Sequence, residues 1–215
     1  MKIKNYQDYV IKDGQLIGKF DDMYREYDGV PWNQDKTAFG IFSDIDLLII
    51  KKHKERLNYN SILEVGCGLG FFTKRLKNEL GRDIIVSGMD ISETAITKAD
   101  SNFPDIDFYC ANIASKDFEI INKYDLIVAK EILWYVLDHL EVYFNNLSKL
   151  SNNYIYISQS FPEVENYLGK AIFPDADSLI EYISVRFDII YAVIEKDSEY
   201  NMRELAHVIA MKIDA

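Results

Sequence analysis

Cysteine, proline and glycine are all scarce in this 215-residue chain, which contains two cysteines, four prolines and ten glycines. Cys67 and Cys110 cannot build a disulfide framework, and neither lies in a Cys-x-x-Cys or histidine-rich motif that would bind zinc. The low proline and glycine content excludes a fibrous or low-complexity protein, and the 48% of hydrophobic residues excludes a disordered one. We therefore expect one compact domain with no metal site, since the chain is short for two domains.

Basic residues are too few for a protein that binds nucleic acid through its phosphates. The chain has 24 Lys and Arg against 35 Asp and Glu, and its net charge of −11 would repel a phosphate backbone. No apolar run approaches the roughly 20 residues of a membrane-spanning helix, and the first residues lack the apolar core of a signal peptide. These absences predict a cytoplasmic protein that has neither a nucleic acid nor a membrane as its partner.

From residue 61 onward, short apolar runs alternate with helical patterns. The predicted strands are 61–65, 84–89, 106–110, 124–129, 153–158, 187–195 and 205–213. The predicted helices are 71–80, 92–103, 138–150 and 175–183. Apolar strands separated by helices indicate a mostly parallel sheet that is covered on both faces. The last two strands have no helix between them, so they should pair as an antiparallel hairpin around a turn at 197–201.

Residues 1–60 have a different character from the rest of the chain. They contain no clear strand, although aromatic residues such as Tyr24 and Trp32 are scattered through them. Their one strong helical pattern, over about 37–56, ends in basic side chains, which favour the carboxyl end of a helix. This pattern predicts an N-terminal helical cap over residues 1–60.

A glycine-rich loop, Gly66-Cys-Gly-Leu-Gly70, follows the first predicted strand of the repeating region. Dinucleotide-binding loops have the pattern G-x-G-x-x-G, whereas here the third glycine comes one residue early. The loop also lacks the Gly-Lys-Ser/Thr end of a phosphate-binding P-loop. Asp90 ends the second strand, where a carboxylate can accept hydrogen bonds from both hydroxyls of a ribose. Asn112 follows the third strand, where its amide can meet an adenine edge.

Four motifs in this order resemble those of class I S-adenosylmethionine-dependent methyltransferases. They are Glu-Val-Gly-Cys-Gly-Leu-Gly at 64–70, Met-Asp-Ile-Ser at 89–92, Cys-Ala-Asn at 110–112 and Tyr-Asp-Leu-Ile-Val-Ala-Lys-Glu-Ile-Leu at 124–133. The resemblance implies a Rossmann-like three-layer α/β sandwich whose mostly parallel seven-stranded sheet ends in an antiparallel hairpin. It also implies that residues 61–215 form the S-adenosylmethionine-binding methyltransferase domain, behind an N-terminal lid over 1–60.

The same resemblance implies a donor site for S-adenosyl-L-methionine, with S-adenosyl-L-homocysteine as the product. The glycines would border the methionine portion, Asp90 would hold the ribose, and Ile91 and Ile113 would flank the adenine. Asn112 stands where the family usually has aspartate, and it keeps a carbonyl acceptor for the adenine amino group. The full predicted donor set is Glu64, Gly66, Cys67, Gly68, Gly70, Asp90, Ile91, Asn112, Ile113 and Lys130.

A finer resemblance is to small-molecule methyltransferases of the nodulation type, which N-methylate an amino sugar. Those enzymes have an Asp-Pro-Trp-Asn element before the first helix and an aromatic pair after the fourth strand. Here the corresponding stretches are 24–33 and 131–135, and Gly29 and Val30 interrupt the Asp-Pro spacing. The match is therefore partial.

The predicted acceptor side begins after the fourth strand. Glu131 and His139 are the candidate catalytic residues, because a hydroxyl acceptor needs a base whereas an amine needs only to be neutral. The alternative is that Glu131 orders the loop and that His139 is a solvated helix residue. The predicted acceptor-binding residues are Tyr24, Trp32, Glu131, Trp134, Tyr135, Gln159, Tyr167 and Lys170. For the aromatic members, ordinary packing is the competing explanation.

The expected function is methylation of a small polar metabolite, such as an amino-, phospho- or nucleotide-linked sugar in glycan or secondary-metabolite biosynthesis. A tRNA or protein methyltransferase is one alternative, and a catalytically silent donor-binding partner subunit is another. A dehydrogenase that binds NAD would need the longer glycine spacing. The oligomeric state expected is a monomer or a homodimer.

Overall fold

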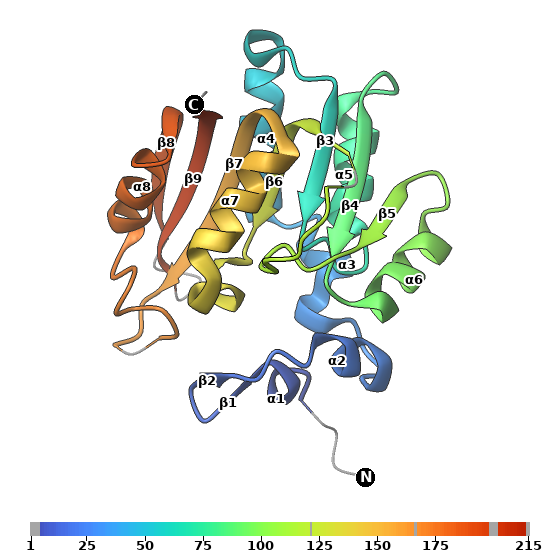
Figure 1. Ribbon diagram of the computed structural model, residues 1–215. Helices are drawn as coiled ribbons and strands as arrows, with labels where there is room; N and C mark the ends of the chain where they lie inside the picture. The colour runs from blue at the N-terminus through green and yellow to red at the C-terminus, as the bar shows by residue number, and fades with distance from the viewer. Residues whose placement is uncertain (1–4, 121, 166, 198–201, 214–215) are drawn as a thin grey trace. The chain divides into compact units, whose positions relative to one another are not determined.

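The computed structural model describes residues 5–120, 122–165, 167–197 and 202–213 (Figure 1). It divides into two compact units, Met1–Asn112 and Ile113–Ala215. In the parts of the chain that the structure describes, no helix is long and apolar enough to cross a membrane.

The first unit opens with short elements that the sequence analysis missed in part. They are α1 (Gln7–Val10), β1 (Ile11–Lys12), β2 (Gln15–Leu16), α2 (Phe20–Glu26), a 3-10 turn η1 (Pro31–Asn33), α3 (Gln34–Thr37) and α4 (Ile41–Leu57). The expectation of no strand before residue 60 was wrong, because β1 and β2 form an antiparallel hairpin. Its turn is Asp13-Gly14, and both residues have positive φ angles, 52° and 75°. Asp-Gly is the sequence signal for such a two-residue turn.

The helix predicted over 37–56 corresponds to α4, which begins later than expected because α3 ends at Thr37. Gly40, with an extended ψ of 168°, is the N-cap of α4, so the long helix begins at Ile41. It ends at Leu57, where Asn58 adopts a left-handed conformation with φ of 50°. Asparagine tolerates that conformation, which terminates helices.

The sheet of the first unit is parallel and follows the predicted alternation. Its strands are β3 (Ser61–Val65), β4 (Ile85–Asp90) and β5 (Asp107–Cys110), in the order β5-β4-β3, with helices α5 (Phe71–Leu80) and α6 (Glu93–Asn102) between them in the chain. As predicted, Ser92 caps α6, since its hydroxyl accepts from the Ala95 N–H.

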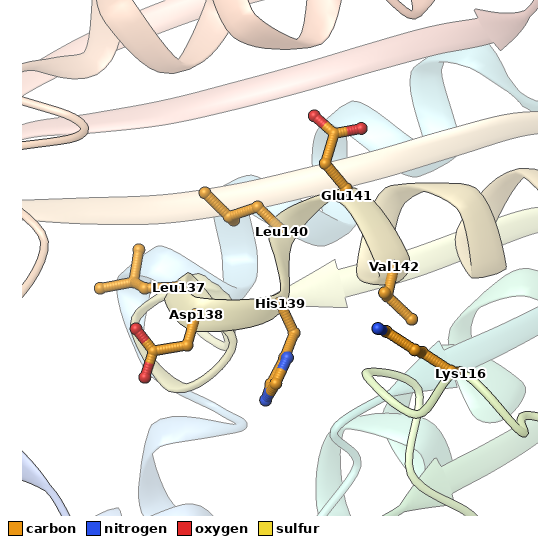
Figure 2. A pocket seen from close by; sticks show the side chains of 7 residues that line it. All are labelled: Lys116, Leu137, Asp138, His139, Leu140, Glu141 and Val142. Atoms are coloured by element: carbon orange, nitrogen blue, oxygen red, sulfur yellow. The ribbon is translucent and has the colours of Figure 1, made fainter.

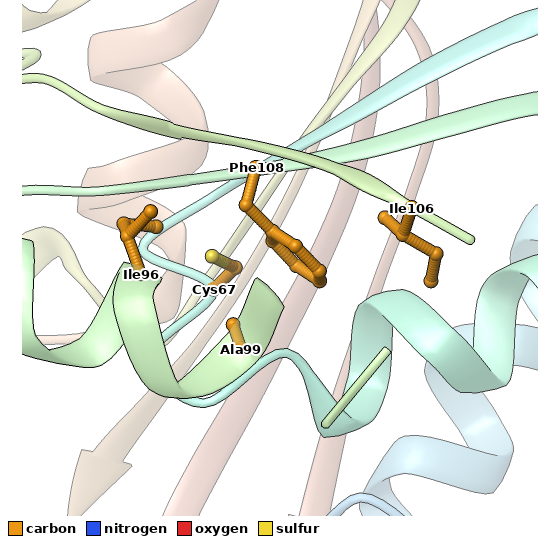
Figure 3. Close-up of a cluster of buried hydrophobic side chains, with 5 residues drawn as sticks. All are labelled: Cys67, Ile96, Ala99, Ile106 and Phe108. Carbon is orange, nitrogen blue, oxygen red and sulfur yellow. The ribbon is translucent and has the colours of Figure 1, made fainter. Parts of the chain in front are cut away.

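A small hydrophobic core lies directly behind the glycine loop. It consists of Cys67, Ile96, Ala99, Ile106 and Phe108 (Figure 3). Phe108 packs so closely on β4 that a Cβ on Gly88 would lie 2.6 Å from the ring. The loop therefore has a rigid apolar support rather than a solvent-filled gap beneath it.

The second unit contains the remaining four strands. Its elements are β6 (Tyr124–Lys130), 3-10 turns η2 (Leu133–Tyr135) and η3 (Leu137–His139), α7 (Leu140–Leu150), β7 (Ser151–Pro162), α8 (Ala176–Ser184), β8 (Phe187–Asp197) and β9 (Met202–Lys212). Strands β6 and β7 are parallel, and β9 pairs antiparallel with both β7 and β8, in the order β6-β7-β9-β8. The predicted antiparallel hairpin is thus confirmed, while most of its turn, 198–201, lies outside the described residues.

Several boundaries in this unit differ from the predictions, and two of the differences involve candidate site residues. The helix expected from 138 begins at Leu140, because residues 137–139 form the 3-10 turn η3. Strand β7 runs to Pro162, since its end pairs with β9 as far as the Pro162–Met202 contact. The longer strand carries Gln159 and Ser160 within the ladder instead of in the following loop.

Candidate active site

The glycine loop connects β3 to α5 in the first unit. Gly66, Gly68 and Gly70 all have positive φ angles, of 77°, 53° and 78°. At Gly68 a second constraint is added, because a Cβ there would lie 2.6 Å from the Tyr24 hydroxyl oxygen and would collide with the Gln34 amide. Only glycine satisfies both the conformation and the close approach.

The backbone N–H groups of this loop are already engaged. Those of Gly66 and Cys67 donate to the Met89 carbonyl, at 2.7 and 3.0 Å, and that of Gly70 donates to the Cys67 carbonyl at 3.0 Å. The Gly68 N–H donates to Asp90 Oδ2 at 2.9 Å, and the Leu69 N–H to Gln34 Oε1 at 3.1 Å. Loops that cradle a diphosphate direct N–H groups at the ligand. In this loop the N–H donors are already bonded to other parts of the protein and do not point at a ligand. A dinucleotide is therefore disfavoured.

Asp90 is held at the carboxyl end of β4. Besides the bond from Gly68, its Oδ1 accepts from the Ser92 N–H at 2.9 Å. Burial raises the pKa of this carboxyl, and the backbone hydrogen bonds oppose the shift. Each carboxylate oxygen has a second acceptor site. Asp90 can therefore still accept two hydroxyl groups, as the ribose role requires.

The other predicted donor residues differ in what their side chains contact. Glu64 is buried and accepts a hydrogen bond from the Thr73 hydroxyl, so it joins β3 to α5. The Cys67 side chain points into the core (Figure 3), where burial raises the pKa of its thiol. Ile91 is 47% exposed at the end of β4, as a residue that stacks on a ligand would be. Asn112 is exposed, whereas Ile113 is buried in the second unit.

The N-terminal segment contacts this site through a residue that the sequence analysis did not select. Gln34 begins α3, and its Nε2 donates to the Tyr24 hydroxyl at 3.1 Å. Trp32 and Asn33 precede it with φ angles of 52° and 50°, a conformation that costs free energy for a bulky residue. Trp32 packs on the rings of Tyr24 and Tyr6, at centroid distances of 6.4 and 5.3 Å. No sequence motif marks Gln34.

Helix α2 is tied to the start of α6 in the same unit. Asp21 Oδ1 accepts from the Ser92 hydroxyl at 2.9 Å and from the Thr94 N–H at 2.8 Å. The Thr94 backbone bond is the main cause that lowers the pKa of Asp21. The Lys98 ammonium donates to the Tyr24 carbonyl. Both donor-side loops, after β3 and after β4, are therefore bonded to the segment that carries α2 and α3.

On the acceptor side, in the second unit, Glu131 follows β6 in a left-handed conformation with φ of 55°. Its Oε1 accepts from the Ser160 N–H at 2.8 Å, and its Oε2 accepts from the Ser160 hydroxyl at 2.7 Å and from Gln159 Nε2 at 3.1 Å. Gln159 is fully buried, and its Oε1 accepts from the Leu133 N–H at 3.0 Å. These bonds fix the turn after β6 against the end of β7.

Three aromatic rings gather next to this turn. Trp134 meets Phe161 and Tyr167 edge to face, with ring centroids 5.3 and 5.4 Å apart. The Tyr167 hydroxyl donates to the Phe173 carbonyl at 2.7 Å, and the Lys170 ammonium lies 5.6 Å from the Tyr167 ring centroid. The structure thus brings together Glu131, Trp134, Gln159, Tyr167 and Lys170 from the predicted acceptor set.

His139 is the N-cap residue of α7 in the second unit. It lines an open hollow of about 500 Å³ at the start of α7 (Figure 2), together with Lys116, Leu137, Asp138, Leu140, Glu141 and Val142. Figure 2 shows the Lys116 side chain reaching toward Val142, while Glu141 points away from it. Within the described ranges, no group of three His, Cys, Asp or Glu side chains could hold a metal ion.

Comparison with known proteins identifies the family. The family described as "Methyltransferase domain" matches residues 58–213. The chain belongs to this methyltransferase family. Its curated relatives include a malonyl-[acyl-carrier protein] O-methyltransferase of Bacillus anthracis, which is 29% identical over 143 residues, 64% of this chain and 48% of that protein. A phosphoethanolamine N-methyltransferase of Triticum aestivum is 37% identical over 82 residues, 36% of this chain and 16% of that protein. The chain thus spans about half or less of these two relatives.

Solved methyltransferase structures share the fold. The N-methyltransferase NodS of Bradyrhizobium japonicum, in complex with S-adenosyl-L-homocysteine, has a TM-score of 0.67 and 16% identity, covering 91% of this chain and 99% of that one. The magnesium protoporphyrin IX methyltransferase of Synechocystis has a TM-score of 0.59 and 16% identity, covering 97% and 93%. These likenesses confirm the predicted Rossmann-like methyltransferase fold, which this chain shares with NodS.

Proposed function

We propose that this chain is an S-adenosylmethionine-dependent methyltransferase. The observation that carries the proposal is the Asp90 carboxylate, which is bonded to Gly68 of the glycine loop and retains acceptor capacity for two ribose hydroxyls. The loop cannot carry a side chain at Gly68, because Tyr24 and Gln34 approach it closely there. Its engaged N–H groups suit a ligand without a diphosphate. When bound, S-adenosylmethionine supplies a methyl group that its sulfonium already activates.

The chain's own residues then have to orient the reactants and exclude water. Alignment of two reactants can lower a barrier by about 7–11 kcal/mol. In the first unit, Asp90 would hold the ribose, Ile91 would flank the adenine, and the glycine loop would border the methionine portion. The segment with Tyr24 and Trp32 would cover the donor. Lys130 and Asn112 keep their predicted donor-side roles within this proposal.

We propose a small polar metabolite with an amine as the acceptor. The support is the group of aromatic rings next to the Glu131 turn, Trp134 with Phe161 and Tyr167, because the faces of such rings attract a cation. Tyr135, Gln159, Tyr167 and Lys170 would contribute further contacts. A small acceptor also agrees with a net charge of −11. His139 remains the candidate base for a hydroxyl acceptor, and a carrier-protein acceptor is the second candidate because of the Bacillus anthracis relative.

Isothermal titration tests the donor. S-adenosylmethionine and S-adenosylhomocysteine should bind, whereas NAD should not. Binding of NAD alone would refute the proposal. The acceptor is then sought by measuring S-adenosylhomocysteine release with amino sugars, nucleotide sugars, phosphoethanolamine, a malonyl carrier protein and bulk tRNA. Release with tRNA alone would exclude the small-molecule acceptor, and donor binding without release from any of them would favour the silent partner subunit.

Glu131 should act on turnover by positioning the turn after β6. Its carboxylate already accepts three hydrogen bonds, so Glu131→Ala should lower turnover at least about tenfold because that turn loses its supports. Glu131→Gln keeps one carbonyl oxygen for the Ser160 N–H but sets its NH2 against the Gln159 NH2, so it should lose less turnover than Glu131→Ala, about threefold. The rate of S-adenosylhomocysteine release, with the best acceptor from the screen, measures both variants.

The exposed Glu163, changed to alanine, is the matched control and should leave the rate unchanged. Equal losses in Glu131→Ala and Glu131→Gln, with unchanged melting temperatures and unchanged affinity for S-adenosylhomocysteine, would instead identify Glu131 as a base. The pH profile separates the two roles further, because loss of a base removes the acidic limb of the rate profile.

A further inference from the structure

Leu69 carries the one N–H of the glycine loop that donates to a side chain of the N-terminal segment. The N–H groups of Gly66, Cys67 and Gly70 are bonded to backbone carbonyls, and that of Gly68 is bonded to Asp90. The Gly66 and Cys67 bonds join the loop to the end of β4, the Gly70 bond closes the loop on itself, and the Gly68 bond holds the proposed ribose acceptor. The loop therefore has little to offer to a carboxylate, which needs hydrogen-bond donors.

Gln34 brings such donors to the loop. Its Oε1 accepts from the Leu69 N–H at 3.1 Å, and one of its two Nε2 hydrogens points to the Tyr24 hydroxyl at 3.1 Å. Both side chains lie directly against the Cα of Gly68, on the side where a Cβ would be. The second Nε2 hydrogen has no partner among the hydrogen bonds that join the described residues.

The position of this pair is fixed by the rest of the unit. Tyr24 is 3% exposed, and its carbonyl accepts from Lys98 of α6. Asp21, on the same helix, is bonded to Ser92 and Thr94 next to Asp90. The left-handed backbone at Trp32 and Asn33 turns the chain so that α3 begins at the loop. A strained conformation that is held by its surroundings is common at ligand sites.

We propose that Gln34 binds the amino-acid end of the methyl donor. The inference rests on the proposed function, since it assigns a further residue to the same donor site. Gln34 keeps its Oε1 on Leu69 and directs its remaining Nε2 hydrogen to the donor carboxylate, with the Tyr24 hydroxyl beside it. In this arrangement the N-terminal segment contacts the methionine portion of the donor, and Asp90 contacts its ribose.

The experiment compares two ligands that differ only at that end. S-adenosylhomocysteine carries the amino-acid group, and 5′-methylthioadenosine has the same adenosine and thioether without it. Isothermal titration of Gln34→Ala should show at least about a tenfold loss for S-adenosylhomocysteine and less than about a twofold change for 5′-methylthioadenosine. Gln34→Glu keeps an acceptor for Leu69 but replaces the donor with a negative charge, so its loss for S-adenosylhomocysteine should be at least as large.

The exposed Gln15, changed to alanine, is the matched control and should alter neither affinity. Melting temperatures with and without ligand establish that each variant is folded. Equal losses for both ligands would mean that Gln34 only orders the loop, and an unchanged affinity for S-adenosylhomocysteine would mean that it does not contact the donor. Either result overturns the inference while leaving the proposed function intact. A wild-type chain that binds neither ligand would instead refute the proposed function, and the inference with it.

Discussion

Replacement of Asp90 by alanine is expected to weaken the binding of S-adenosylhomocysteine at least about 100-fold. The reason is the loss of two hydrogen bonds from ribose hydroxyls to a charged acceptor, each of which contributes about 1.5–3 kcal/mol. The variant also leaves the Gly68 and Ser92 N–H groups without the carboxylate that now accepts from both. Isothermal titration measures the effect, and thermal melting shows whether the variant is still folded.

Two further measurements separate ribose binding from a general effect on the fold. Asp83→Ala, an exposed aspartate that precedes β4, should leave the affinity unchanged. Burial raises the pKa of Asp90, so wild-type affinity should fall as the pH decreases toward that pKa and the carboxyl becomes protonated. Asp90→Asn has no such proton to gain, and its weaker affinity should vary less with pH. An Asp90→Ala variant that binds as tightly as wild type would remove Asp90 from the donor site.

The donor side was predictable because its residues lie at strand ends that the alternating pattern locates. The glycines at 66, 68 and 70 and Asp90 occupy such positions, and sequence spacing alone relates them. Gln34 was not predictable, since its contact with Leu69 spans 35 residues and depends on the left-handed turn at Trp32 and Asn33. Bulky residues rarely adopt that conformation, so no pattern indicates it.

On the acceptor side, the sequence predicted several of the residues but not the hydrogen bonds between them. Glu131, Trp134 and Gln159 were all selected, but the sequence did not reveal that Gln159 joins Glu131 to the Leu133 N–H. That link arises because β7 continues to Pro162 as a partner of β9. Strand ends are set by such long-range pairing, which local propensity does not encode.

Replacement of Phe108 by alanine is expected to destabilise the chain by about 3–5 kcal/mol. That range is typical for a buried phenylalanine, because the lost transfer free energy adds to the cost of the cavity. Phe108 is 9% exposed and packs with Cys67, Ile96, Ala99 and Ile106 (Figure 3). Urea unfolding followed by circular dichroism measures the change. Phe39→Ala makes the same substitution at a 62% exposed ring, and it should cost less than about 1 kcal/mol.

The same variant connects the core to the site. The Phe108 ring supports the glycine loop from below, because a Cβ on Gly70 would lie 2.6 Å from its Cζ atom. Without the ring, Gly70 and Cys67 lose the surface that keeps the loop in one conformation, so ligand binding has to order it. Ordering a loop costs free energy, and this cost makes the net binding free energy of the ligand less favourable. Below its melting temperature, Phe108→Ala should therefore bind S-adenosylhomocysteine several-fold more weakly than Phe39→Ala. If the two variants had equal stabilities or equal affinities, this core would not support the loop.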